Sequence, residues 1–205
     1  MIKCLENKVF IASDMDGVLI DFCTPYLQKV WDTHPELRDI IKRKDLMNPQ
    51  IWKNLDDYDI NHWLEVDGNI CPEITSGDFY GGLTPIKAMH DALKDKQLFI
   101  VSKSHPVSFE SKGAWIKRWF PKANYHLVDC SPGSGEQKVS VFLDPNMVFQ
   151  DDTPLSKFDV WLEDNTRELL GVRNVFGGDP DRYRIIDYGY NRGVAGVEDV
   201  PRIYL

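Results

Sequence analysis

Two aspartates separated by one residue directly follow a short apolar run, Val9-Phe-Ile-Ala-Ser13. They lie in the segment Asp14-Met-Asp16-Gly17. A carboxylate at a strand end can attack phosphorus and form an aspartyl-phosphate, and a second carboxylate nearby can transfer the proton of the leaving group. A calcium loop would need a Glu at its twelfth position, where this chain has Pro25. A solvated turn remains the alternative, so the pair alone does not decide its role.

Two further polar residues could serve the same chemistry. Ser102 follows a second apolar run, Leu98–Val101, where a hydroxyl and the adjoining backbone N–H groups can hold phosphate oxygens. Lys138 comes later in the chain and could offset phosphate charge. Taken alone, Ser102 fits a helix cap and Lys138 a solvated surface position. Their meaning therefore depends on their order along the chain.

Adjacent acids, Asp151 and Asp152, follow a third apolar run, Met147–Phe149. If the fold brings them beside Asp14, the carboxylates repel one another unless a cation lies among them. Mg²⁺ suits such a site because it takes one or two carboxylates together with phosphate and water. The sequence therefore predicts Mg²⁺ as the cofactor.

The three apolar runs predict strands that are buried on both faces of a parallel sheet. Helical patterns fall between them: one begins at Thr84-Pro85, and another has Trp115, Ile116, Trp119 and Phe120 on one face. Strands that alternate with helices predict an α/β fold with a doubly wound parallel sheet, whose sites lie at the carboxyl ends of the strands.

Residues 23–80 break this alternation and predict a small, mostly helical insertion after the first strand. Helix-start patterns lie at Thr24-Pro25 and at Thr33-His-Pro-Glu36. The core domain would then comprise residues 1–22 and 81–205. Weaker strand candidates are Tyr125–Val128 and Val172–Phe176, and the chain from Gly177 onward has no clear periodicity and is expected to be irregular.

The order of these motifs resembles that of the haloacid dehalogenase superfamily of phosphotransferases, and within it the 5′(3′)-deoxyribonucleotidases, the type C 5′-nucleotidases. The evidence consists of Asp14-Met-Asp-Gly-Val-Leu-Ile-Asp-Phe22, Gly82-Leu-Thr-Pro85, Ser111-Lys-Gly-Ala-Trp-Ile-Lys117 and Asp151-Asp-Thr-Pro154. The resemblance implies a Rossmann-type core of this superfamily and spans residues 9–154.

The resemblance also implies Mg²⁺-dependent hydrolysis of a phosphomonoester through an aspartyl-phosphate, with a nucleoside monophosphate as the substrate. Asp14 would be the nucleophile and a metal ligand. Asp16 would be the general acid and base and would bind the metal through its backbone carbonyl. The remaining implied residues are Ser102, Lys103 or Ser104, and Lys138 for phosphate, and Asp151 and Asp152 for the metal.

The chain departs from the family pattern in its second motif, Ser102-Lys-Ser-His-Pro106, where the family commonly has Thr-Ser-Pro. Thr153 stands in place of an Arg. Fewer residues separate the second motif from the Trp-containing helix, so Lys112 competes with Lys138 as the phosphate lysine. The sequence favours Lys138, which precedes the acidic pair at a suitable distance.

The insertion would correspond to the superfamily's cap, which covers the site, excludes water and selects the leaving group. In the nucleotidase branch, aromatic side chains of the cap stack on the base. The candidates for this contact are Phe22, Trp52 and Phe79, followed by Trp31, Trp63 and Tyr80. An aromatic side chain in a small helical cap more often belongs to its core.

The composition limits the possible partners. The 205 residues include 24 Lys and Arg and 32 Asp and Glu, so the formal charge is −8, which disfavours a nucleic-acid polymer as the partner. The apolar runs are too short to span a membrane, and the four scattered cysteines with no export signal indicate a cytoplasmic protein with free thiols. The expected partner is a small phosphomonoester, and the oligomeric state stays open. The alternatives are a phosphatase for a sugar phosphate or other small phosphoester, or a non-catalytic binding module of the same fold.

Overall fold

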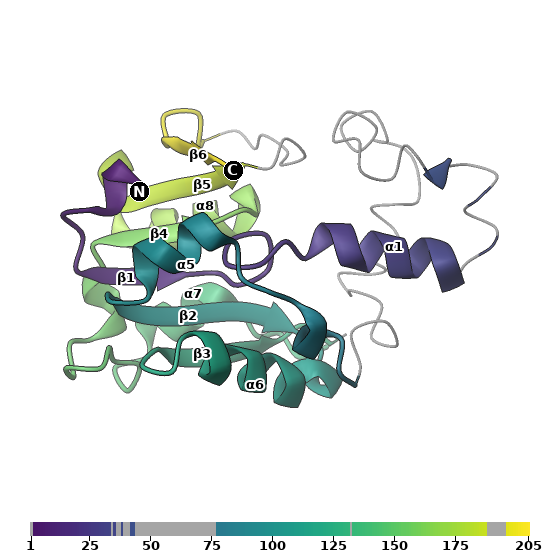
Figure 1. Ribbon diagram of the computed structural model, residues 1–205. Coiled ribbons are helices and arrows are strands. Elements are labelled where there is room, and N and C mark those ends of the chain that lie inside the picture. The colour runs from purple at the N-terminus through teal and green to yellow at the C-terminus, as the bar shows by residue number, and fades with distance from the viewer. Residues whose placement is uncertain are drawn as a thin grey trace.

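The computed structural model describes residues 2–33, 35, 38, 42–43, 77–131, 133–187 and 196–205. Within these residues, one sheet holds six parallel strands in the order β3-β2-β1-β4-β5-β6 (Figure 1). The strands are β1 (Phe10–Ser13), β2 (Gln97–Ser104), β3 (Asn124–Asp129), β4 (Val160–Glu163), β5 (Tyr183–Asp187) and β6 (Arg202–Tyr204). The predicted doubly wound α/β fold is confirmed.

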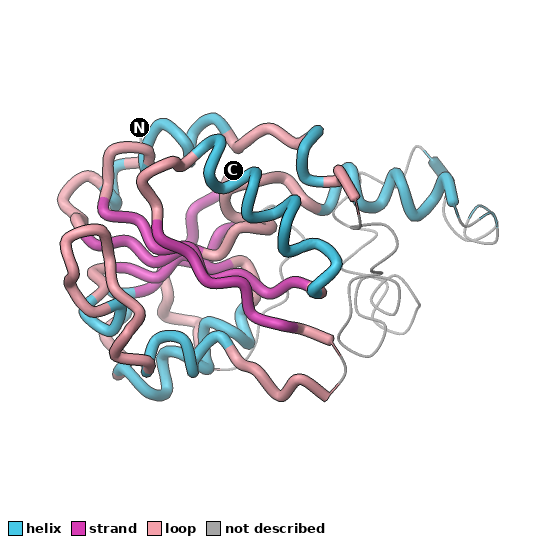
Figure 2. The backbone as a smooth tube through the Cα atoms, turned by 90° about the horizontal axis from the view of Figure 1, so that it is seen from below, coloured by secondary structure: helices cyan, strands magenta, loops and turns pink. Residues whose placement is uncertain are grey.

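Helices cover both faces of this sheet, as Figure 2 shows. Helix α5 (Lys87–Leu93) and helix α6 (Phe109–Trp119) contribute to one core cluster, and α7 (Lys138–Leu143) and α8 (Thr166–Phe176) contribute to the other. Successive strand residues alternate between the two clusters: Ile11 belongs to the first and Ala12 to the second. This alternation explains why the strand sequences are apolar at almost every position.

The helical stripe predicted around Trp115 is confirmed, since Trp115 and Ile116 on α6 are buried in the first cluster. The predicted start at Thr84-Pro85 is two residues early. The N-cap residue of α5 is Ile86, and Pro85 forms an isolated antiparallel bridge with Ile20 instead. Pro85 therefore ties the entry of α5 to the loop that follows β1.

The third predicted strand, Met147–Phe149, is wrong. Val148 forms only an isolated bridge with Pro154, and the backbone N–H of Phe149 donates to the Thr153 carbonyl at 2.8 Å, which closes a turn. The strand that pairs with β1 at this side of the sheet is β4. The apolar side chain of Phe149 is nevertheless buried, because it lies in the second core cluster and packs against the ring of Phe10.

The weak strand candidate Tyr125–Val128 is confirmed as part of β3, whereas Val172–Phe176 lies in helix α8. The chain after Gly177 is not irregular throughout, because it contributes strands β5 and β6.

The segment expected to form the cap is described only at its two ends. Helix α1 (Cys23–Thr33) follows β1, and the short 3-10 helix η4 (Tyr80–Gly82) precedes α5. Thr33 is the last residue of α1, and the helix expected to begin there lies mostly outside the described residues. Most of residues 23–80 lies outside the described residues, so the domain boundary stays a prediction. Among the helices that are described, none has the length and apolar character needed to cross a membrane.

Candidate active site

The sheet order reverses between β1 and β4, which makes the carboxyl ends of these two strands the topological switch point, where open α/β sheets bind their ligands. Ser13 is in register with Leu162, and the N–H of Asp14 donates to the Leu162 carbonyl at 2.9 Å. Asp14 therefore lies beside Glu163, the last residue of β4. The pairing of the two strands alone brings these acids together.

A buried lysine joins the two acids. Lys138, the first residue of α7, places its Nζ 2.9 Å from Asp14 Oδ2 and 2.8 Å from Glu163 Oε2. All three residues are buried. Burial alone lowers the pKa of a lysine, but the charges of Asp14 and Glu163 outweigh it and raise the pKa of Lys138 well above its usual value. Lys138 is therefore a fixed positive charge against Asp14.

A second buried lysine serves the second aspartate. Lys112 on α6 donates from Nζ to Asp16 Oδ2 at 2.6 Å, to Ser102 Oγ at 2.9 Å and to the Lys103 carbonyl at 2.8 Å. The Ser102 hydroxyl also hydrogen-bonds Asp14. Lys112 and Lys138 thus approach different aspartates, and which of them binds phosphate stays a prediction.

The two aspartates have opposite pKa shifts. Burial raises the pKa of Asp14, but the charges of Lys138 and Lys112 and a hydrogen bond from Ser102 outweigh it, so the pKa is lowered. Burial is also the largest influence on Asp16, and there it prevails with help from the charge of Asp14, although Lys112 opposes it, so the pKa is raised. A carboxylate with a lowered pKa next to a carboxyl with a raised pKa is the order of acidities that a nucleophile and a general acid require.

Tyr80 completes the surroundings of Asp16. Its hydroxyl donates to Asp16 Oδ2 at 3.3 Å, and Lys112 Nζ lies 5.3 Å from the centre of its ring. Burial and the charge of Asp16 raise the pKa of Tyr80 well above its usual value, so the phenol keeps its proton and acts as a donor.

Three carboxylates at the switch point could hold a cation. Within the described residues, Asp14, Glu163 and Asp164 form the one acidic group of this kind, with one oxygen from each lying within 4.8 Å of the others. Asp14 Oδ1 is buried and has no hydrogen-bond partner, which is expected of an atom reserved for a ligand. Both oxygens of Glu163 already have donors, Lys138 Nζ and the N–H of Asn165 at 3.1 Å. The chemistry therefore fits Mg²⁺ with Asp14 and Asp164 as ligands and Glu163 as the partner of Lys138.

Asp164 reaches this position because the chain turns closely past it at Gly17. The backbone of Gly17 has φ +70°, and a Cβ placed there would lie 2.1 Å from Asp164 Oδ2. Burial, followed by the negative charge of Asp14, raises the pKa of Asp164 to about 7. Crowded carboxylates behave in this way when no cation offsets their charge.

The structure does not bring Asp151 and Asp152 to the site, which corrects their prediction as metal ligands. Both are exposed in the turn after Phe149, and the neighbouring Gln150 side chain donates to the carbonyls of Leu98 and Lys122. Leu98 lies at the amino end of β2, whereas the site lies at the carboxyl ends of the strands. The four residues of β1 alone separate these edges by about 13 Å at 3.3 Å per residue.

Among the other predicted residues, the structure places Ser102 in the site and directs Lys103 elsewhere. Lys103 Nζ pairs with Glu168 on α8 at 2.5 Å, although its carbonyl accepts from Lys112. Phe22 is buried and its ring packs against Tyr26, Phe79 and Tyr80. It is therefore part of the core as described.

Of the three first candidates for base contact, the other two remain predictions. Phe79 is half-buried and forms an edge contact with the ring of Tyr80. Trp52 lies outside the described residues.

Sequence reasoning missed Glu163 and Asp164. A usable signal was present: Val160-Trp-Leu162 is an apolar run, and it ends at two acids followed by Asn165. The Asn165 side chain accepts from the N–H groups of Arg167 and Glu168 and caps α8. An acidic pair between an apolar run and a helix cap marks the carboxyl end of a strand, and Asp151-Asp152 lack the cap.

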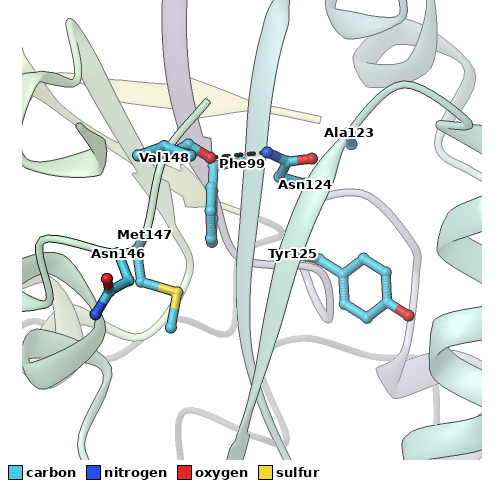
Figure 3. Close-up of a pocket in the computed structure, with 7 residues that line it drawn as sticks. All are labelled: Phe99, Ala123, Asn124, Tyr125, Asn146, Met147 and Val148. Atoms are coloured by element: carbon cyan, nitrogen blue, oxygen red, sulfur yellow. Dashed lines mark hydrogen bonds between the residues drawn. The ribbon is translucent and has the colours of Figure 1, made fainter. Parts of the chain in front are cut away.

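A pocket lies away from the acidic group, between the first residues of β3 and the turn that precedes Asp151 (Figure 3). Phe99, Asn124 and Met147 are among its lining residues, and Asn124 Nδ2 donates to the Val148 carbonyl at 2.8 Å. Its lining holds no acid, lysine, histidine or cysteine. The pocket therefore offers no counterpart to the chemistry at the switch point.

No family model matches the sequence, and no curated protein matches it either. Thirteen chains of solved structures resemble the fold. One is a crystal structure from Thermotoga maritima, provisionally described as a beta-phosphoglucomutase. It is 14% identical, with a TM-score of 0.48 over 95% of this chain and 93% of that chain. A likeness of this degree says nothing about activity.

Proposed function

We propose that this protein is a Mg²⁺-dependent phosphomonoesterase of the haloacid dehalogenase type. The observation that carries the proposal is the state of Asp14. One of its oxygens is held by Lys138 at 2.9 Å, and the other is buried without a partner beside Glu163 and Asp164. A lowered pKa keeps this carboxylate ionised and able to attack.

The reaction would proceed in two steps. Asp14 attacks phosphorus, and the bond to the leaving oxygen breaks as Asp16 gives that oxygen its proton. Asp16 then takes a proton from water, which attacks the aspartyl-phosphate and releases inorganic phosphate. Lys138, Lys112 and Ser102 would stabilise the charge on the phosphoryl oxygens. Mg²⁺ bound to Asp14 and Asp164 would supply further positive charge to the phosphoryl group.

The nature of the leaving group rests on the sequence resemblance to deoxyribonucleotidases. The described residues fit a sugar phosphate equally well, because Phe22 is packed in the core and the other expected aromatic contacts are untested. A panel of deoxyribonucleotides, ribonucleotides and sugar phosphates at saturating Mg²⁺ separates the two substrate classes. We propose a nucleoside monophosphate, and a ranking led by sugar phosphates would replace it.

The test of the metal site compares two aspartate variants in the full-length protein. Asp164→Asn should lower kcat/KM by about 100-fold and raise the Mg²⁺ concentration needed for activity, because it removes a charged oxygen ligand. Asp151→Asn is the matched control and should behave as wild type, since Asp151 lies at the opposite edge of the sheet. Release of inorganic phosphate is the readout. Equal loss in both variants, or full wild-type activity in excess EDTA, contradicts the metal site. If the wild type hydrolyses no phosphomonoester at all, the proposed function is wrong.

A further inference from the structure

Tyr80 occupies an unusual position for a buried tyrosine. It is 1% exposed, and its hydroxyl donates to Asp16 Oδ2, the same oxygen that accepts from Lys112. The other oxygen, Asp16 Oδ1, is buried and has no partner. The carboxyl group is thus bound by two donors on one side only.

We propose that Tyr80 is a positioning residue that, together with Lys112, fixes the Asp16 carboxyl so that Oδ1 faces the leaving group. The inference rests on the proposed phosphomonoesterase activity and deepens it. A single hydrogen bond leaves a carboxyl free to rotate, whereas two donors that approach one oxygen from different elements define its orientation. Lys112 approaches from α6, and Tyr80 approaches from η4.

The surroundings of Tyr80 keep its hydroxyl in place. Its ring packs against Phe22 with centroids 6.3 Å apart and against Phe79 at 5.2 Å. The side chain of Ser104, the last residue of β2, hydrogen-bonds the Tyr80 hydroxyl. A donor at the phenol oxygen directs the phenol proton away from Ser104, toward Asp16. The side chains of Ser104, Tyr80 and Asp16 therefore form a short chain of hydrogen bonds from the sheet to the acid.

Packing alone does not require this arrangement, because a phenylalanine would fill the same space and keep the contact with Lys112. The hydroxyl adds only the bond to Asp16 and the bond from Ser104. This makes Tyr80→Phe a clean substitution for removing the positioning effect while the ring cluster is kept.

The experiment exploits the leaving group. Departure of an alkoxide needs a proton from Asp16, whereas departure of p-nitrophenolate does not. The value of kcat/KM reports the steps up to this departure. In Tyr80→Phe, kcat/KM for the best alkyl phosphomonoester should fall about tenfold, the upper end for an ordinary hydrogen bond. The kcat/KM for p-nitrophenyl phosphate should change by less than about twofold. Tyr183→Phe is the control, since it removes the bond from Tyr183 to the Gly177 carbonyl far from Asp16. It should leave both values unchanged.

Ser104→Ala provides a second variant that does not alter the aromatic cluster. It should lower kcat/KM in the same selective manner, by a smaller factor than Tyr80→Phe. Equal losses on both substrates in Tyr80→Phe, or no loss on the alkyl ester, would overturn the positioning role while leaving the phosphomonoesterase intact. An inactive wild type would overturn the role together with the proposed function. Thermal unfolding of each variant identifies a general loss of stability.

Discussion

Replacing Lys138 by Met tests the electrostatic core of the site. Lys138 Nζ lies 2.9 Å from Asp14 Oδ2 and 2.8 Å from Glu163 Oε2, and the three residues are buried. Met has a similar length and volume but no charge. The substitution therefore removes the cation and leaves two carboxylates in a region that excludes water.

The expected loss of stability follows from this geometry. Removing one partner of a buried ion pair costs about 3–5 kcal/mol, because the remaining charge is uncompensated. For a chain of this size each kcal/mol lowers the unfolding temperature by about 2–4 °C, so Lys138→Met should lower it by roughly 6–20 °C. Adding Glu163→Gln to this variant removes one of the two stranded charges. The double variant should recover about 2 kcal/mol.

The assay is urea unfolding of the wild type, the two single variants and the double variant, at pH 7 in EDTA so that no divalent cation replaces the lost charge. The coupling free energy of the double-mutant cycle measures the Lys138–Glu163 interaction. A loss below about 1 kcal/mol in Lys138→Met would refute the assignment of Lys138 as the buried counterion, against the cost expected for a broken pair. A double variant that is less stable than Lys138→Met would refute the pairing with Glu163.

Two further predictions concern a glycine at the site and an ion pair remote from it. Gly17→Ala should abolish most activity, because the added Cβ would displace Asp164. Gly135 also has a positive φ but has open space around it, so Gly135→Ala should only lower the free energy of unfolding by about 1–2 kcal/mol through backbone strain. If both variants keep wild-type activity, the close approach at position 17 has no functional role. The second prediction concerns Asp199, whose pKa is lowered below 3.8 by the hydrogen bonds from Arg173. This pair therefore stabilises the folded state above that pH, and the stabilisation is lost as the pH falls through the pKa of Asp199 in the folded state. The difference in unfolding temperature between wild type and Asp199→Asn should be constant between pH 7 and 5 and should shrink only below 3.8; a difference that shrinks already at pH 6 would contradict this origin.

The sequence was sufficient to predict the fold class and the positions of the site residues that follow the apolar runs of β1 and β2. Asp14 and Ser102 follow apolar runs that are strands in the structure, and strand pairing brings them together. The sequence could indicate these positions because a buried parallel strand has a local signature: an apolar run that ends abruptly at polar residues.

The same signature explains the main error. Met147–Phe149 is also an apolar run, followed by Gln150 and two acids, but Phe149 is buried by packing on Phe10 in a turn, not by strand pairing. An apolar run of three residues does not distinguish a strand from a turn with one buried side chain, because both place an apolar residue where it can be buried. The distinction lies in a long-range contact, which sequence periodicity does not contain.

Strand β5 was missed for a related reason. Its sequence has Arg184 between Tyr183 and Ile185, which interrupts the apolar run. In the structure the guanidinium of Arg184 donates to the carbonyls of Pro180 and Tyr183, which compensates its burial. A charged residue that donates to nearby backbone carbonyls can occupy a buried strand, so a single charge is weak evidence against a strand.

The two buried lysines also bear on the cofactor. Among the residues that the structure describes, the four carboxyl groups of Asp14, Asp16, Glu163 and Asp164 face the ammonium groups of two lysines, so their formal charge with every group ionised is 2 − 4 = −2. Burial, together with the charges of the neighbouring acids, raises the pKa values of three of the four acids. One divalent cation would balance the same excess without protonation and would leave Asp16 free to hold a proton for the leaving group. The charge of the site therefore favours a divalent cation independently of the family resemblance, and the acid that would bind it with Asp14 is Asp164 rather than Asp151 or Asp152.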